Sequence, residues 1–298
     1  MPNPTRETSG GRVYNDLRNL AKREGLSSAD VMLGYVLERF LYRMAQAPEG
    51  GRHFVLKGGL LLAQFGARRA TRDIDLLGQH FTGEDGEVIA RIRSIAAFQV
   101  DDGVTFNPGG LRTAPIRTDE KYGGLRLTMP AALSRAQLKL QLDISFGDPI
   151  TPEARLIDYP QRLDAEPFQI YGYPIDTVIA EKLTTAIDLA EINTRDRDYA
   201  DLYRLICQND IDAIMIRTAI ERTARHRGLR LRPLSTVIGA LPTGRQASYT
   251  RWLSKQEADR HAYPASFADV CATVVAFADP LITGAAITHW SAAHRQWR

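Results

Sequence analysis

The spacing of apolar residues at the start of the chain predicts two amphipathic helices. Apolar side chains recur at helical intervals from Val13 to Arg23 and again, as a broad stripe, from Ala29 to Ala45. Ser28 is placed to cap the second helix. A glycine-containing loop then leads into residues 54–57, an apolar run typical of a buried strand, and a further helix is predicted from Glu84 to Ala97.

Between about residues 98 and 147 the apolar positions alternate with a period of two, which predicts a sheet. The alternating segments are residues 114–117, 125–128 and 138–146, with turns expected at 107–110 and 123–124. In the last segment the leucines, Ile144 and Phe146 share one face, and Asp143 lies on the other. Asp143 is therefore expected to point away from the packed side of the sheet.

After a proline-containing connection at residues 149–174, nearly everything reads as helix, with breaks expected at Pro233, 242–244, Pro264 and Pro280. We expect a core domain at residues 1–174 and a helical domain at 175–298. The aromatic and valine side chains between residues 252 and 277 fit the packed centre of this helical domain better than a base-stacking surface.

Two motifs in the first domain carry the candidate chemistry. Lys57-Gly58-Gly59 follows the predicted strand and opens a predicted helix, an arrangement in which backbone N–H groups can approach an oligophosphate. In Asp73-Ile74-Asp75 the period of two places both carboxylates on one face of a strand. Magnesium is bound by one or two carboxylates together with substrate phosphates, so the second motif suits Mg²⁺.

Each motif also has an ordinary interpretation. A Gly-Gly after a strand is commonly a tight turn, and an Asp-x-Asp is commonly a surface feature. Phosphatases with an aspartyl nucleophile also contain Asp-x-Asp, but there an apolar strand runs directly into the first aspartate, whereas three arginines and a threonine occupy residues 68–72 here. Asp143 is a candidate third metal ligand or a solvated side chain on the open face of its strand.

The two motifs in this order are what the chain shares with a known family. The segment from Phe54 to Leu77 resembles the core of the AbiEii/AbiGii nucleotidyltransferase toxins, whose pattern is an apolar strand, Lys-Gly-Gly, a short helix and Arg-x-Thr-x-Asp-x-Asp. Arg69, Thr71, Asp73 and Asp75 fit that pattern without a gap. The resemblance extends from about Gly34 to about Leu205, and beyond that the chain is similar only in being helical.

The resemblance implies a fold and a set of partners. The expected fold is α+β: a mixed sheet of the polymerase-β-like nucleotidyltransferase type, flanked by helices and followed by a C-terminal helical bundle. It implies a nucleoside triphosphate as substrate, Mg²⁺ or Mn²⁺ as cofactor, an RNA acceptor such as the 3′ end of tRNA, inhibition of translation and growth, and a cognate antitoxin protein.

The resemblance also assigns roles to individual residues. Asp73, Asp75 and Asp143 would hold the metal, and Lys57, Gly58, Gly59, Thr71 and Lys182 would bind the nucleotide. Asp201 matches an aspartate that the family needs for activity, and it would orient either Lys182 or a metal-bound water. From the residues alone, Asp198 and Asp201 could equally form a surface salt-bridge patch with Arg195.

The composition of the chain says more about where the protein is located than about the reaction it catalyses. The net charge is +3, and two distant cysteines support neither a disulfide framework nor a metal knuckle. The first residues lack the apolar core of a signal peptide, and no apolar run is long enough for a membrane span, so a cytoplasmic protein is expected. One stretch is strongly basic and predicts RNA binding; its arginines are Arg217, Arg222, Arg225, Arg227, Arg230 and Arg232.

Three other functions stay open from the sequence. The chain could modify a small molecule, although the basic stretch counts against that, or it could modify a protein. It could also be an inactive nucleotide-binding regulator, although the retained acidic residues count against that function.

Overall fold

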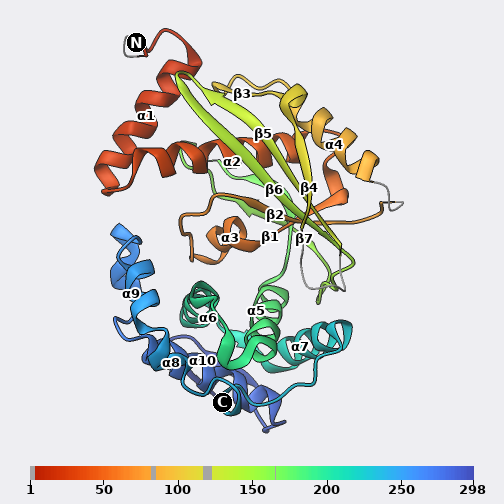
Figure 1. The fold of residues 1–298 in the computed structure, drawn as a ribbon, viewed down its shortest axis with the longest axis vertical. Coiled ribbons are helices and arrows are strands. Elements are labelled where there is room, and N and C mark those ends of the chain that lie inside the picture. The colour runs from red at the N-terminus through yellow and green to blue at the C-terminus, as the bar shows by residue number, and fades with distance from the viewer. Residues whose placement is uncertain (1–3, 82–84, 117–122, 165) are drawn as a thin grey trace. The chain divides into compact units, whose positions relative to one another are not determined.

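The computed structural model describes residues 4–81, 85–116, 123–164 and 166–298, and it separates into two compact units (Figure 1). The sheet unit comprises residues 1–64, 70–147 and 155–172. The helical unit comprises residues 65–69, 148–154 and 173–298. The division expected at residue 174 had assigned both short segments, 65–69 and 148–154, to the core domain.

The described residues of the sheet unit form one eight-stranded mixed sheet, whose strands follow the order β3-β5-β6-β2-β1-β8-β7, with β4 also paired to β5. Its strands are β1 (Phe54–Lys57), β2 (Ile74–Gly78), β3 (Val104–Phe106), β4 (Arg112–Ile116), β5 (Gly124–Leu133), β6 (Ala136–Phe146), β7 (Arg155–Tyr159) and β8 (Phe168–Gly172). Two pairs, β2 with β6 and β1 with β8, are parallel, and the others are antiparallel. The predicted class, a mixed sheet flanked by helices, is confirmed.

Helices α1 (Ser9–Glu24) and α2 (Ser28–Gln46) pack against each other and bury one apolar cluster that also includes residues of β3 and β5. Helix α2 contacts β5, β6 and β8 and lies along the sheet in Figure 1. The cap of α2 is Ser27, whose hydroxyl accepts from the Asp30 amide at 3.4 Å, and not Ser28, which is the first helical residue. Helix α4 spans Asp85–Ala97.

Two expectations for the sheet unit need correction. Residues 149–174 are not only a connection, because they contain β7 and β8, and β8 pairs in parallel with β1 at Leu56 and Gly172. Both strands have five residues, and the prolines on either side of each one made the whole segment resemble a connection. Gly124, expected in a turn with Gly123, is the first residue of β5, and Arg117, expected to end the strand at 114–117, lies outside the described residues.

The described residues of the helical unit form helices and a small three-stranded sheet, whose first strand lies between two of the helices in the chain. The helices are α5 (Ile175–Leu189), α6 (Asp196–Gln208), α7 (Ala213–Arg227), α8 (Leu241–Gly244), α9 (Gln246–Leu253) and α10 (Phe267–Ile282), with strands β9 (Ile211–Asp212), β10 (His289–Ser291) and β11 (Gln296–Trp297). The sheet order is β11-β10-β9. The sequence predicted helix for nearly all of this unit, and that expectation was wrong at residues 211–212, 289–291 and 296–297, because these strands are two or three residues long and leave no periodic pattern.

Aromatic side chains fix the C-terminal hairpin to the helices. Trp290 is fully buried, and its indole N–H donates to the Ile206 carbonyl at 2.7 Å. Phe267, Val274 and Phe277 on α10 are also buried, as expected for core residues. Pro280 does not break α10, which continues to Ile282, and Pro242 lies in the first turn of α8, where its missing N–H is not needed. Among the described residues we find no helix with the length and apolarity to cross a membrane.

Candidate active site

Three carboxylates of the sheet unit converge as the sequence predicted. One oxygen from each of Asp73, Asp75 and Asp143 lies within 4.8 Å of the other two, and all three residues are partly buried. Asp75 and Asp143 are register partners on the parallel strands β2 and β6, so their side chains leave the same face of the sheet. Asp73 precedes β2 by one residue, and its Oδ1 accepts a hydrogen bond from the Thr71 hydroxyl at 2.9 Å.

The two strand aspartates belong to a row of four charged residues that crosses the sheet. Lys57 on β1 is the register partner of Asp75, and Arg126 on β5 is the register partner of Asp143. The row therefore runs cation, anion, anion, cation over four neighbouring strands. We call these four residues, Lys57, Asp75, Asp143 and Arg126, the charged row.

Arg126 holds both oxygens of Asp143. Its Nε donates to Oδ1 at 2.7 Å and its Nη2 donates to Oδ2 at 2.6 Å, which is the bidentate geometry that an arginine fork favours. Sequence analysis did not single out this residue. The alternation in Leu125-Arg126-Leu127 places Arg126 on the polar face of β5, but only the register with β6 shows which carboxylate it meets.

Gly58 is required by the approach of Asp75. Its φ is +66°, in the left-handed region, and a Cβ there would lie 1.9 Å from Asp75 Oδ2. The amide of Gly59 hydrogen-bonds the same carboxylate. The helix expected after the glycines is short, because α3 spans only Gly58–Leu61 before a 3₁₀ turn at Leu62–Phe65. The phosphate-binding role of Lys57, Gly58 and Gly59 stays a prediction.

The neighbouring carboxylates change the pKa of Asp75. Burial, and then the charges of Asp73 and Asp143, raise the pKa of Asp75 to about 6, against the opposing effects of Lys57 and the Gly59 amide. Three partly buried carboxylates that repel one another form a hard oxygen-donor set, which fits a divalent cation such as Mg²⁺ or Mn²⁺.

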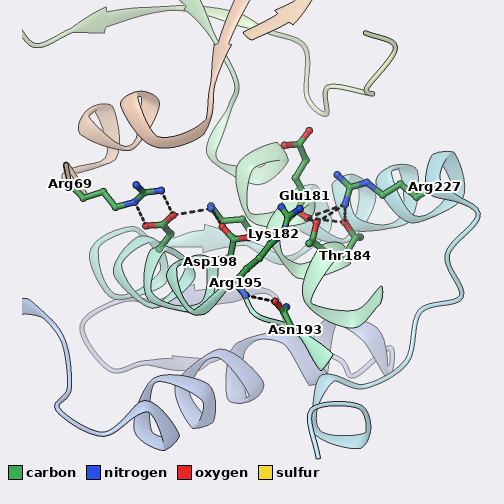
Figure 2. Close-up of polar contacts among 10 residues, drawn as sticks. Arg69, Glu181, Lys182, Thr184, Asn193, Arg195, Asp198 and Arg227 are labelled. Carbon is green, nitrogen blue, oxygen red and sulfur yellow. Dashed lines mark hydrogen bonds and ion pairs between the residues drawn. The ribbon is translucent and has the colours of Figure 1, made fainter. Parts of the chain in front are cut away.

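A second ionic cluster lies within the helical unit (Figure 2). The Lys182 ammonium on α5 donates to Asp198 at 2.6 Å and to Asp201 at 2.9 Å, both on α6. Arg69 donates to the two oxygens of Asp201 at 2.8 and 3.0 Å. Figure 2 shows Arg69 and Lys182 directed toward the same helix, and we call Arg69, Lys182, Asp198 and Asp201 the buried cluster.

Burial makes the buried cluster different from a surface patch. Asp201 is 1% exposed, and its partners are Arg69 and Lys182, whereas the Arg195 amide donates to Asn193. Burial alone would raise the pKa of Asp201, but the two cations overcome this effect and lower it to about 2. Burial alone would likewise lower the pKa of Lys182, but Asp198 and Asp201 raise it. Lys182 is therefore a fixed ammonium.

A match to a protein family covers most of the chain and includes parts of both units. The family model of the nucleotidyl transferase AbiEii toxin of type IV toxin–antitoxin systems matches residues 39–274. The chain belongs to this family. The match continues past Leu205, where the resemblance in the sequence had been only general, and it includes the carboxylates of the sheet unit and the buried cluster. The chain is thus a nucleotidyltransferase-family toxin of a toxin–antitoxin system, which implies an antitoxin partner and a nucleotide substrate.

Solved structures similar to this toxin come from Helicobacter pylori. JHP933 is 16% identical with a TM-score of 0.49, over 87% of this chain and 94% of that one. A chain described as a candidate nucleotidyltransferase is 16% identical with a TM-score of 0.48, over 87% of this chain and 97% of that one. No curated protein matches the toxin.

The six arginines of the basic stretch do not lie in equivalent environments. The Arg217 guanidinium donates to the carbonyls of Pro280 and Leu281 at the end of α10. Arg227 donates to Thr184 and Thr185 on α5, as Figure 2 shows in part. The other four are more open to solvent: Arg222, Arg225, Arg230 and Arg232. RNA binding by the stretch stays a prediction, and these four are the better candidates.

Proposed function

We propose that this toxin transfers a nucleoside monophosphate from a nucleoside triphosphate to an RNA hydroxyl, releasing pyrophosphate, and that the acceptor is the 3′ end of tRNA. The observation that carries the proposal is the convergence of Asp73, Asp75 and Asp143 beside the Gly58–Gly59 turn. Nucleotidyl transfer depends mainly on positioning and on stabilising charge, and a carboxylate cluster beside a glycine turn supplies the means for both.

The three carboxylates would hold Mg²⁺ or Mn²⁺. When bound, the ion supplies Lewis-acid stabilisation of the phosphates and lowers the pKa of the attacking hydroxyl. Thr71 orients Asp73 through the 2.9 Å hydrogen bond, and the Gly59 amide orients Asp75. Lys57 places a positive charge next to Asp75 at the end of β1, where it could also meet a phosphate.

For Lys182 and Asp201 we propose a positioning relationship. The family resemblance implies that Lys182 meets the triphosphate, and the contacts inside the helical unit support a role for Asp201 in orienting that lysine. Asp201 accepts from the Lys182 ammonium at 2.9 Å, while Arg69 fixes Asp201 from the other side. This arrangement favours Lys182, rather than a metal-bound water, as the group that Asp201 orients.

A labelling experiment tests the reaction and its acceptor together. The purified toxin is incubated with each labelled nucleoside triphosphate, Mg²⁺, and total RNA, total protein or small metabolites. We expect label in the tRNA fraction with wild type and none with Asp73→Asn. Asp158→Asn, which removes an exposed carboxylate from β7, is the matched control and should label at the wild-type rate. Label in protein or metabolites instead would refute the RNA proposal, and an active Asp73→Asn variant would refute the metal site.

The basic stretch is tested separately by its dependence on salt. Replacing Arg222, Arg225, Arg230 and Arg232 by glutamine should weaken tRNA binding and flatten its dependence on salt, by about one in the log–log slope for each phosphate that is no longer neutralised. The control removes four cations from α1, Arg12, Arg18, Lys22 and Arg23, and should leave the slope unchanged. Equal effects of both quadruple variants would remove the reason for placing the RNA on this stretch.

A further inference from the structure

In the charged row, Arg126 contacts the same carboxylate, Asp143, that a metal ion would need. Both oxygens of Asp143 are occupied by Arg126, at 2.7 and 2.6 Å. The same carboxylate supplies one of the three oxygens that lie within 4.8 Å of one another. A divalent ion shared by all three aspartates would therefore need an oxygen that the arginine already holds.

Arg126 is the more exposed partner of this contact. Its side chain is 44% exposed, whereas that of Asp143 is 15% exposed, so a large part of the arginine lies in solvent and not in packed surroundings. The hydrogen bond to Asp143, together with the charges of Asp143, Asp73 and Asp75, raises the pKa of Arg126. The arginine thus experiences attraction from all three proposed metal ligands.

We propose that Arg126 is an internal counter-cation that competes with the divalent metal for Asp143, and that it thereby sets the metal affinity of the site. It is a positioning residue: it holds Asp143 in the metal-free protein and gives up at least one carboxylate oxygen when the ion binds. This inference rests on the metal site of the proposed function, and it adds a residue that the motifs do not contain.

Metal binding by the full chain tests the competition without using activity. The affinity for Mn²⁺ alone is measured by titration calorimetry, and free Mn²⁺ by electron paramagnetic resonance, for wild type, Arg126→Gln and Arg112→Gln. Arg112 is an exposed arginine on β4 that pairs with Thr128, so its replacement removes the same charge outside the charged row. We expect Arg126→Gln to bind Mn²⁺ at least roughly tenfold more tightly than wild type, and Arg112→Gln to stay within about twofold, since charge effects at a distance are weak in water.

A double-mutant cycle separates competition from general electrostatics. If Arg126 acts through Asp143, Arg126→Gln should change Mn²⁺ affinity by less than about twofold when Asp143→Asn is already present. An equal tightening in both backgrounds, or no tightening in either, would overturn the competition. Failure of the metal site itself looks different, because Mn²⁺ binding would then be absent from wild type and Arg126→Gln, or would be unaffected by Asp75→Asn. Arg126→Lys, which keeps the charge without the fork, should bind with an affinity between those of wild type and Arg126→Gln.

Discussion

Replacing Asp75 by asparagine should stabilise the metal-free protein while removing its activity. Burial and two neighbouring carboxylates raise the pKa of Asp75 from 3.8 to about 6, so its ionised form is disfavoured in the folded state. The folded protein binds this proton more tightly than the unfolded chain does. The free energy of unfolding therefore falls as the pH rises from about 4 through 6. Asparagine resembles the protonated side chain and avoids the loss.

The magnitude follows from the same values. At pH 7.5 the ionised Asp75 costs about 3 kcal/mol, and at pH 4.5 only about 1 kcal/mol, since most of the carboxyl is then protonated in the folded protein. The gain from Asp75→Asn in the free energy of unfolding should therefore shrink by about 2 kcal/mol between these two pH values. Saturating Mg²⁺ should reverse the order, because only the wild type retains all three carboxylate ligands.

The assay must report on the sheet unit. All three tryptophans, Trp252, Trp290 and Trp297, lie in the helical unit, so tryptophan fluorescence would follow the other unit. Hydrogen exchange of amides in β2 and β6, measured in urea with a chelator present, reports the relevant unfolding. Asp158→Asn should lie within about 0.5 kcal/mol of wild type. An Asp75→Asn variant that is no more stable than wild type at pH 7.5, or whose gain does not shrink at pH 4.5, would refute the reasoning.

Two further substitutions probe the sheet turn and the buried cluster. Gly58→Ala should destabilise the sheet unit by at least about 1 to 2 kcal/mol and abolish transfer, because φ is +66° and the new Cβ would overlap Asp75; wild-type hydrogen exchange and labelling would contradict this. Asp201→Asn should destabilise the helical unit by about 3 to 5 kcal/mol, because Arg69 and Lys182 lose their buried carboxylate, and urea unfolding followed by tryptophan fluorescence measures it. The depressed pKa of Asp201 gives stability that is present above about pH 4 and lost as the pH falls through about 2, so the variant should lack this part of the acid transition.

Much of the sheet unit was predictable because its signals are local. The alternation in residues 138–146 predicted the face of Asp143, and the motif placed Asp73 and Asp75 close together, although Asp73 lies just before β2 and not in the strand. What could not be predicted was register, since the contact of Arg126 with Asp143 depends on how β5 and β6 align along their whole length. A hairpin register is set by the turn and the packing of both strands, and no residue near Arg126 encodes it.

The helical unit shows a different limit. Its long helices were visible from their period, and Lys182 was one expected partner of Asp201, but the contact of Arg69 with Asp201 was not predicted, because Arg69 lies more than a hundred residues earlier in the chain. The strands at residues 289–297 carry too few positions for a pattern, and their place is fixed by the packing of Trp290 against distant helices. Both features arise from long-range packing, which periodicity does not report.

The balance of charge in the row across strands β1, β2, β6 and β5 bears on how the toxin folds. Two cations and two anions on neighbouring strands sum to zero, so the charged row itself carries no net charge. A freshly synthesised chain can therefore close its sheet without first capturing an ion from the cell. Under the proposed mechanism, ion loading would then follow folding as a separate event, and the folded toxin would gain its activity only when the ion binds.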